Sequence, residues 1–343
     1  MTTTGAADAV TTIRRLALAA GFAGALRAAA EIGVADAVGD EPATTAQIAG
    51  EVNAVPETLG RLLRALSVHG VFASDDGDSY RHTPASRLLR EDHPRSLRYM
   101  VLWATEPWTW TVWPHLADAV RTGKGVFEEQ HGKDFFTYLH DDAPESAEVF
   151  DRAMTQASRL SSDALAAALD LTGTARVADI AGGQGHLLAT ILERDPALTG
   201  VLFDLPAVIG NVDPRLAPGG ALAGRVSTVA GDCRRGVPVE ADVYVLKNVL
   251  EWDDESTVAA LANVARSAPP GARIAIIENL IDGSSEGAFT TGMDLLLLLN
   301  VNGKKHLTAD LVALAARAGL EVTGIRPVGP FLHLVDCRVA TKS

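Results

Sequence analysis

The hydrophobic pattern of the first 95 residues predicts short amphipathic helices followed by a β-hairpin. Apolar residues recur at helical spacing over residues 10–38, 44–52 and 56–70. We expect Thr44 or Thr45 to cap the second helix, and Gly70 to end the third. The hairpin is predicted from Val71–Phe72 and residues 80–83, which flank the turn Asp75–Gly77. This order is typical of a winged helix, which serves DNA binding or dimerisation, and its mixed charges favour dimerisation.

The pattern changes near residue 171 to an alternation of strands and helices. Such alternation is typical of a parallel sheet with helices on both faces. Strands are predicted at residues 176–180, 200–204, 226–230, 241–247 and 272–278. The two closing strands, 320–325 and 332–340, are joined by a link too short for a crossover, so they must pair antiparallel. The prediction is an α/β, doubly wound sheet with an antiparallel last strand.

Residues 96–170 are predicted to be helical and carry most of the tryptophans: Trp103, Trp108, Trp110 and Trp113. These side chains fit a core, a dimer contact or a pocket for a flat, apolar substrate. The chain is therefore divided into an N-terminal helical domain (1–95), a helical linker and pocket region (96–170) and a cofactor-binding domain (171–343).

The composition narrows the classes of partner. A net charge of −13 argues against nucleic acid or an anionic membrane. The only cysteines, Cys233 and Cys337, cannot form a disulfide framework and fit a reducing cytoplasm. No signal peptide is evident at residues 1–10, and the most apolar run, Met293–Val301, is too short to span a bilayer.

A glycine-rich turn follows the strand at residues 176–180. Gly182, Gly183 and Gly185 remove side chains where the next helix offers free N–H groups. A dinucleotide turn requires a further glycine where this chain has Leu188. Asp179 can instead hold a cationic amine, and Asp204 ends the next strand, where a ribose-binding carboxylate belongs. The turn predicts an S-adenosylmethionine site; the alternative is a tight turn without a ligand.

Several further segments carry a resemblance to a known family. They are Arg61–Leu66 with Gly70–Phe72, Asp134–Leu139, Asp179–Gly185, Phe203–Pro206, Gly231–Asp232, Lys247 through Trp252–Glu255, and Glu278. In their order and spacing the chain resembles bacterial small-molecule O-methyltransferases that tailor anthracyclines and other aromatic natural products, with plant caffeate-type enzymes more distant. The resemblance covers nearly the whole chain. It implies a Rossmann-like methyltransferase domain, an N-terminal winged-helix dimerisation domain and a cytoplasmic homodimer.

The resemblance also implies site residues. The cofactor-binding set is Asp179, Gly182, Gly183, Gly185, Asp204, Leu205, Gly231, Asp232, Cys233, Lys247 and Trp252. Asp204 would bind the ribose hydroxyls and Leu205 would lie against the adenine. Asp232 would accept from the adenine amine and Cys233 would pack on the ring, although Asp232 could simply be a solvated acid. The substrate-binding set is Trp103, Met154, Asn248 and Met293.

One segment departs from the family. Relatives with a general base carry Leu-His-Asp-Trp, whereas this chain reads Leu250-Glu251-Trp252, one residue shorter and without histidine. Glu251 takes the place of the histidine counted from Lys247, and that of the aspartate counted from Trp252. The family's Gly-x-Glu-Arg-Thr is replaced by Gly303–Thr308, while the other flanking acid survives as Glu278. Glu251 and Glu278 are the predicted catalytic residues.

Three chemical explanations of this departure remain open. A phenol has a pKa near 10 and a glutamate about 4.3, so a glutamate is a weak base for it unless burial raises its pKa. The favoured explanation is methyl transfer by proximity alone to an already acidic hydroxyl or carboxylate, such as the phenol of an anthraquinone or similar polyketide. The second makes Glu251, or His306 folded inward, the base, although we expect His306 at the surface. The third is a non-methylation reaction, such as hydroxylation, decarboxylation or cyclisation, with S-adenosylmethionine in a structural role.

Two further readings are disfavoured. A ligand-sensing regulator would need a degenerate cofactor turn, and this turn is intact. No metal site is predicted, because the acidic run Asp253–Glu255 is typical of the start of a helix.

Overall fold

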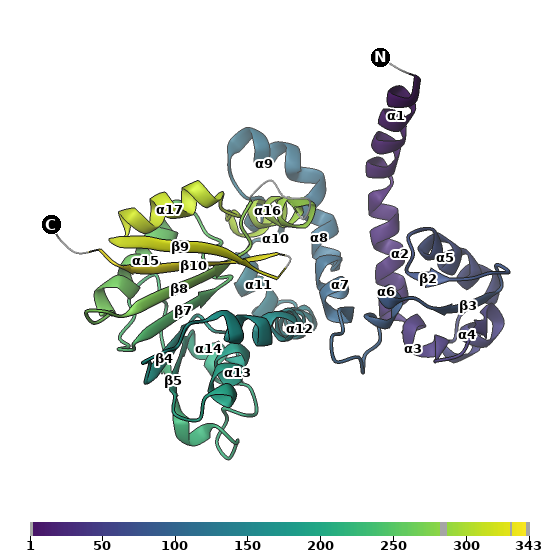
Figure 1. Cartoon of the computed structure of the whole chain (residues 1–343). Coiled ribbons are helices and arrows are strands. Elements are labelled where there is room, and N and C mark those ends of the chain that lie inside the picture. The colour runs from purple at the N-terminus through teal and green to yellow at the C-terminus, as the bar shows by residue number, and fades with distance from the viewer. Residues whose placement is uncertain (1–2, 282–286, 330, 341–343) are drawn as a thin grey trace. The chain divides into compact units, whose positions relative to one another are not determined.

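The computed structural model describes residues 3–281, 287–329 and 331–340 (Figure 1). The chain forms two compact units, one of Met1–Trp110 with Ala143–Ala157 and one of Thr111–Asp142 with Ser158–Ser343. The long helix α12 (Pro144–Ala168) contributes residues to both. The division at residues 95 and 170 stays a prediction.

The first unit contains short helices and a small antiparallel sheet. Its helices are α1 (Thr3–Ala17), α2 (Ala19–Glu31), α3 (Val34–Val38), α4 (Thr45–Glu51), α5 (Pro56–Val68), α6 (Pro84–Arg87), α7 (Arg98–Ala104) and most of α8 (Pro107–Val112). Its strands are β1 (Ala43–Thr44), β2 (Phe72–Ala73) and β3 (Ser79–His82), in the order β1-β3-β2. The β2–β3 pairing confirms the predicted hairpin. Thr44, not Thr45, caps α4, through a capping box with Gln47.

The core of this unit explains why its short helices persist. Ile48, Leu63, Phe72 and Tyr80 are almost completely buried in one cluster, so tertiary packing supplies what such short helices lack on their own.

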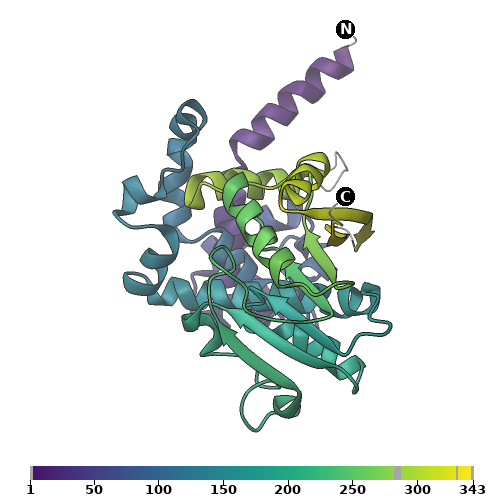
Figure 2. The same cartoon turned by 90° about the vertical axis from the view of Figure 1, so that its left-hand side faces the viewer.

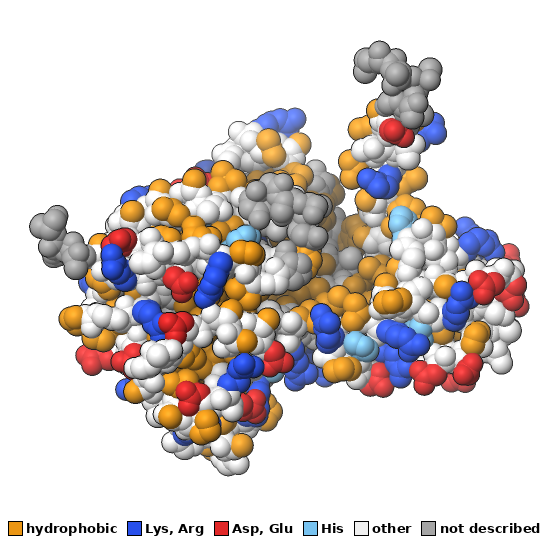
Figure 3. Space-filling model, viewed as in Figure 1, with side chains coloured by type: hydrophobic (Ala, Val, Ile, Leu, Met, Phe, Trp, Pro, Cys, Tyr) orange, Lys and Arg blue, Asp and Glu red, His pale blue; other side chains and the backbone are white. Residues whose placement is uncertain are grey.

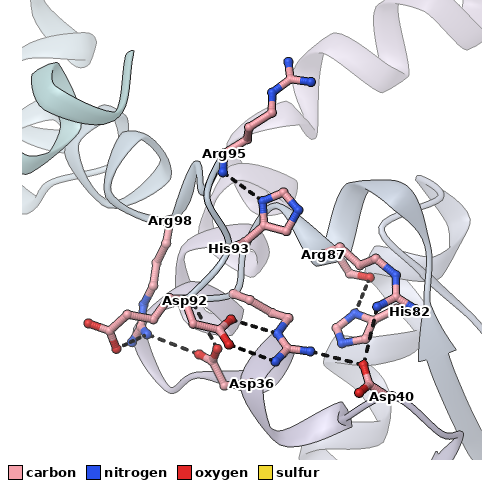
Figure 4. A network of polar contacts seen from close by, with 11 residues as sticks. Asp36, Asp40, His82, Arg87, Asp92, His93, Arg95 and Arg98 are labelled. Carbon is pink, nitrogen blue, oxygen red and sulfur yellow. Dashed lines mark hydrogen bonds and ion pairs between the residues drawn. The ribbon is translucent and has the colours of Figure 1, made fainter. Parts of the chain in front are cut away.

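A polar network lies beside this core, between α3 and the segment after α6 (Figure 4). Arg90 lies 3.1 Å from Asp92 and 3.4 Å from Asp40, and Arg98 pairs with Asp36 at 3.3 Å. Because most of these carboxylates are solvent-exposed, the pairs orient the segment more than they stabilise the fold.

The second unit is built on a seven-stranded sheet of order β6-β5-β4-β7-β8-β10-β9. The strands are β4 (Arg176–Ile180), β5 (Thr199–Asp204), β6 (Val226–Ala230), β7 (Val243–Lys247), β8 (Arg273–Glu278), β9 (Leu320–Val328) and β10 (Leu332–Val339). The first five pair in parallel, and β10 pairs antiparallel with both β8 and β9. The predicted fold class is confirmed, with strand ends shifted by at most a few residues.

Helices cover both faces of this sheet (Figures 1 and 2). The helices of this unit are α9 (Leu116–Thr122), α10 (Phe127–His131), α11 (Phe135–Asp141), the end of α12, α13 (His186–Arg194), α14 (Pro206–Ile209), α15 (Asp254–Ser267), α16 (Gly287–Val301) and α17 (Thr308–Arg317), with 3₁₀ turns η1 (Trp113–His115) and η2 (Ala223–Arg225). One apolar cluster joins the sheet to α15 and α17, and another joins it to α13 and the end of α12. The central strands are therefore buried on both sides.

On the face shown in Figure 3, Lys and Arg side chains alternate with Asp and Glu in each unit rather than forming a continuous basic area. Among the described residues, no single helix has the length and apolar character to cross a membrane; the bent pair Asp8–Ala17 and Ala19–Glu31 meets that test only when taken together.

We expect Leu188→Ala in α13 to reduce the free energy of unfolding by about 2–5 kcal/mol, because Leu188 is completely buried and fills the space above Gly200. Chemical denaturation followed by circular dichroism measures this. The matched control is Leu307→Ala, at a side chain that is 49% exposed, where the change should stay within about 0.5 kcal/mol. Equal effects of the two substitutions would contradict the assignment of Leu188 to the core.

Candidate active site

The sheet brings the predicted acidic and basic residues to one edge. β4 pairs in parallel with β5 and β7, and β7 with β8, so their carboxyl ends are adjacent. Asp204, Lys247 and Glu278 are the last residues of three of these strands, and Asp179 is the penultimate residue of β4. The strand order reverses at β4, and ligands of doubly wound sheets bind at this switch point.

The turn after β4 requires its glycines for identifiable steric reasons. A Cβ on Gly182 would lie 2.5 Å from Cγ of Asp179. Gly185 begins α13 with φ of 81°, where a Cβ would also lie 2.6 Å from Leu216. Ala181, the residue directly after β4, adopts φ of 51° without being glycine, so the turn begins with a strained residue. The backbone of the turn is thereby held close to two carboxylates.

These carboxylates differ in what they bind. Asp204 accepts from the Gly183 N–H at 2.7 Å through Oδ2 and from the Leu205 N–H at 2.6 Å through Oδ1. Asp179 is 2% exposed, and its Oδ2 has no hydrogen-bond partner among the described residues. Burial raises the pKa of Asp179 to about 7, against the opposing effect of Lys247. A buried oxygen without a partner is a site for a cationic or N–H donor.

Lys247 lies on the other side of Asp179. Its Nζ is 3.3 Å from Oγ of Ser158, and burial lowers its pKa although Asp179 and Glu278 act to raise it. Its ammonium therefore compensates part of the negative charge at this edge.

The neighbouring loop supplies the apolar part of the site. Leu205 is 46% exposed, and the N–H of Gly231 donates to the carbonyl of Asp204 at 2.9 Å. A Cβ on Gly231 would lie 2.7 Å from the Phe203 ring, so this close approach also requires glycine. Together with the partnerless Asp179 oxygen, this arrangement fits S-adenosylmethionine, whose amine, ribose and adenine need an acid, a second acid and an apolar surface.

Asp232 is not a solvated acid without partners, because it is paired with a neighbouring arginine. Arg234 donates to both carboxylate oxygens of Asp232, at 3.0 and 2.9 Å, and this contact is the main reason why the pKa of Asp232 is lowered. The Arg234 guanidinium also lies 5.1 Å from the ring centroid of Trp252. Cys233 is buried in the sheet core. Their contacts with adenine stay predictions.

Glu278 holds the segment that lacks the family's histidine. Its Oε1 accepts from the N–H groups of Val249 and Leu250, both at 2.8 Å. Burial raises the pKa of Glu278 more than the Lys305 ammonium lowers it. Asn248 has φ of 52°, a strained conformation that these bonds support. Glu278 therefore fixes the turn after β7; its catalytic role stays a prediction.

Lys305 is the residue that sequence reasoning missed. Its side chain is only 5% exposed, and its ammonium forms an ion pair with Oε1 of Glu251. Its backbone N–H donates to Asp294 of α16 at 2.6 Å. A buried lysine carries no distinct pattern in sequence. The one available signal was that a Lys-Lys-His run stands where relatives carry an acid and an arginine.

The expectation that His306 lies at the surface is wrong. It is 2% exposed, and its Nε2 lies 2.6 Å from the carbonyl oxygen of Leu250. A carbonyl only accepts, so Nε2 carries the proton. Gly303 packs so closely on the carbonyl of Glu251 that a Cβ would lie 2.0 Å from that oxygen. Residues 303–306 thus lie directly against residues 250–251, a contact between segments far apart in sequence.

Comparison with known proteins shows which protein family has this sequence and fold. The profile of an O-methyltransferase domain matches residues 113–321, and that of an O-methyltransferase dimerisation domain matches residues 15–92. A mitomycin biosynthesis 6-O-methyltransferase of Streptomyces lavendulae is 35% identical over 327 residues, covering 94% of this chain and 92% of the relative. The solved structure of a methyltransferase of calicheamicin biosynthesis, in its S-adenosylhomocysteine-bound form, has a TM-score of 0.88 at 31% identity and covers 99% of this chain and 100% of that chain.

The chain belongs to the O-methyltransferase family. It is a methyltransferase, and S-adenosylmethionine is its cofactor. An aclacinomycin 10-hydroxylase of Streptomyces purpurascens is also similar, at 33% identity over 312 residues and covering 89% of this chain and 83% of the relative. Related chains thus include one that is named for a different reaction.

The predicted acceptor-binding residues of this O-methyltransferase fall in both units. Trp103 and Met154 belong to the first, where the Trp103 ring packs edge-on against Phe150 with centroids 6.1 Å apart. Asn248 is exposed after β7, and Met293 is half-buried in α16, both in the second unit. Their contacts with an acceptor stay predictions.

The acidic run before α15 has the predicted helical role. Asp253 caps α15 by accepting from the Ser256 N–H at 2.9 Å. Within residues 3–281, 287–329 and 331–340, no group of three or more His, Cys, Asp or Glu side chains could hold a metal ion.

We expect S-adenosylmethionine to bind more tightly as pH rises from about 6 to about 8, because Asp179 must ionise to attract a cation and its pKa in the free enzyme is about 7. At about pH 6 binding should release a proton, which calorimetry detects in two buffers of different ionisation enthalpy. Asp179→Asn should weaken binding about tenfold and remove this pH dependence.

Asp118→Asn, at an exposed carboxylate on α9, is the matched control and should change neither property. Unaltered affinity and pH dependence in Asp179→Asn would remove Asp179 from the cofactor site.

Proposed function

We propose that this enzyme transfers a methyl group from S-adenosylmethionine to a hydroxyl of an aromatic, polyketide-like secondary metabolite, without a histidine base. The observation that carries the proposal is the intact cofactor turn, in which a partnerless Asp179 oxygen lies beside Gly182 and the Gly183 N–H is held by Asp204. Relatives named for mitomycin and calicheamicin biosynthesis support an acceptor of natural-product type.

The residues of the site are suited to positioning rather than to proton removal. The bound cofactor supplies an activated methyl group, and in-line transfer requires the acceptor oxygen about 3 Å from it. Asp179 and Asp204 would orient the two ends of the cofactor. Glu278 keeps the turn at residues 248–250 in one conformation beside it. Preorganised geometry of this kind supplies a large share of the rate in transfers that need little proton chemistry.

A second function has one specific observation in its favour. The aclacinomycin 10-hydroxylase is nearly as similar as the methyltransferases, and this chain lacks the family's histidine. A non-methylation reaction, such as hydroxylation, decarboxylation or cyclisation, with S-adenosylmethionine as a structural cofactor is therefore the alternative.

We also propose a homodimer formed through a winged-helix N-terminal domain. The matched dimerisation profile, the three-stranded sheet beside α4 and α5, and the exposed apolar residues of α1 support it. Ile13 is 68% and Leu16 63% exposed, a pattern typical of an interaction face. The free, buried thiols of Cys233 and Cys337 support a reducing cytoplasm as the compartment.

The enzyme should convert at least one hydroxynaphthoate or hydroxyanthraquinone into its O-methyl derivative and form an equal amount of S-adenosylhomocysteine. Mass spectrometry of a panel of such acceptors measures both products. Asp204→Ala should raise the KM for S-adenosylmethionine at least about tenfold, since ribose contacts are lost. An altered acceptor without S-adenosylhomocysteine would favour the alternative, and failure of the intact chain to bind S-adenosylmethionine would exclude both.

Sedimentation equilibrium should give twice the chain mass of 36.0 kDa. Ile13→Asp should shift the equilibrium toward the monomer by at least about tenfold in Kd, because a charge would be buried in the interface. Val120→Asp, at a similarly exposed position on α9 (67%), serves as control and should leave the dimer intact. A dimer that tolerates Ile13→Asp would exclude α1 from the interface.

A further inference from the structure

Three groups near the turn after β7 could serve as a base, and each of them is ion-paired, hydrogen-bonded or buried. Glu251 is paired with Lys305 through Oε1. Glu278 is buried, and its Oε1 accepts two backbone N–H groups. His306 uses Nε2 to donate to Leu250, and its unprotonated nitrogen, Nδ1, is buried out of reach of an acceptor. An acceptor hydroxyl entering this site therefore meets no base among these groups that is both free and accessible.

Lys305 is held as an ammonium by the charges that surround it. Glu251 faces it from the turn after β7, Glu278 from the end of β8, and Asp294 from α16. Burial disfavours the charged form, but these carboxylates outweigh it and raise the pKa of Lys305. If Glu251 left the pair to take a proton, it would leave a buried ammonium without its partner, which is strongly unfavourable.

We propose that Lys305 determines which acceptors this enzyme methylates: by holding Glu251 in a buried ion pair it withholds the one carboxylate that could remove a proton, so that the acceptor must already be an oxyanion. This inference rests on the proposed methyl transfer. Lys305 acts through Glu251 and is a positioning residue.

The step balances without any proton acceptor from the protein. The hydroxyl proton leaves to solvent before transfer. An acceptor oxygen lone pair then forms the O–CH₃ bond while the S–CH₃ bond of the cofactor breaks and its electron pair returns to sulfur. Nothing is oxidised or reduced. The acceptors that fit are hydroxyls acidified by a conjugated carbonyl, such as those of hydroxyquinones, rather than plain phenols.

Two acceptors with one ring system test this. 2-Hydroxy-1,4-naphthoquinone is ionised at neutral pH, and 2-naphthol is not. We expect the parent enzyme to prefer the quinone at least about a hundredfold in kcat/KM at neutral pH, and the 2-naphthol rate to rise with pH only as 2-naphthol itself ionises. A 2-naphthol rate that follows the titration of an enzyme group at a pH below the naphthol pKa would overturn the proposal without any variant.

The variants separate specificity from stability. Lys305→Met should free Glu251 and reduce the preference for the quinone at least about tenfold, with a new pH limb below the naphthol pKa. Lys305→Arg should keep the parent preference. Glu251→Gln combined with Lys305→Met should restore it, because no carboxylate is freed and no charge of the pair is left unpartnered.

If Lys305 had a merely structural role, Lys305→Met would change kcat/KM for both acceptors by the same factor, and that result would overturn the inference. Lys304→Met, which affects only a half-exposed pair with Asp254, is the matched control and should leave the preference unchanged. If the enzyme methylated only un-ionised phenols in a wider acceptor panel, this inference would be overturned. If it methylated no acceptor at all, the proposed methyl transfer would be overturned instead.

Discussion

The bonds from the Val249 and Leu250 N–H groups to Glu278 are the interaction on which the reacting part of this molecule depends. Glu278 is the last residue of β8, and the turn that it holds follows the neighbouring strand β7. Because both strands run in parallel inside a sheet covered on both faces, this carboxylate is buried, and backbone donors and the Lys305 ammonium compensate its charge. The turn is therefore confined to one conformation, including the strained Asn248.

Charges of alternating sign continue from this point along the carboxyl edge of the sheet. Asp179 lies next to Lys247, and Lys247 interacts in turn with Glu278 and Glu251, which both face Lys305. A buried row of this kind is stable only if each charge has an opposite neighbour. Asp179 is the member whose compensation is incomplete, with one oxygen unpartnered, and it is also the group beside which a cationic cofactor belongs. The cofactor is therefore expected beside the one carboxylate of this row whose charge is not fully compensated.

Much of this could be predicted because the determining signals are local. Strand periodicity, the cap at Thr44 or Thr45 and the glycine turn each depend on a few consecutive residues, and the structure has them at the predicted positions. The helical stretch predicted over residues 10–38 is instead divided among α1, α2 and α3. β1 was missed, since two residues contain no periodicity and pair only because β3 lies beside them. His306 was placed at the surface because a lone histidine between a lysine and a leucine has no pattern that predicts burial.

By itself, the sequence determined the doubly wound fold, the cofactor turn and the loss of the family's histidine, because these follow from residue order and from the backbone freedom of glycine. Only the tertiary structure decided what replaced that histidine. The Glu251–Lys305 pair joins residues 54 positions apart in sequence, from a turn after β7 and a segment before α17. Whether a glutamate is a base or an ion-pair partner depends on the charge that folding brings within reach of it, and that is a property of three-dimensional position rather than of the sequence around Glu251.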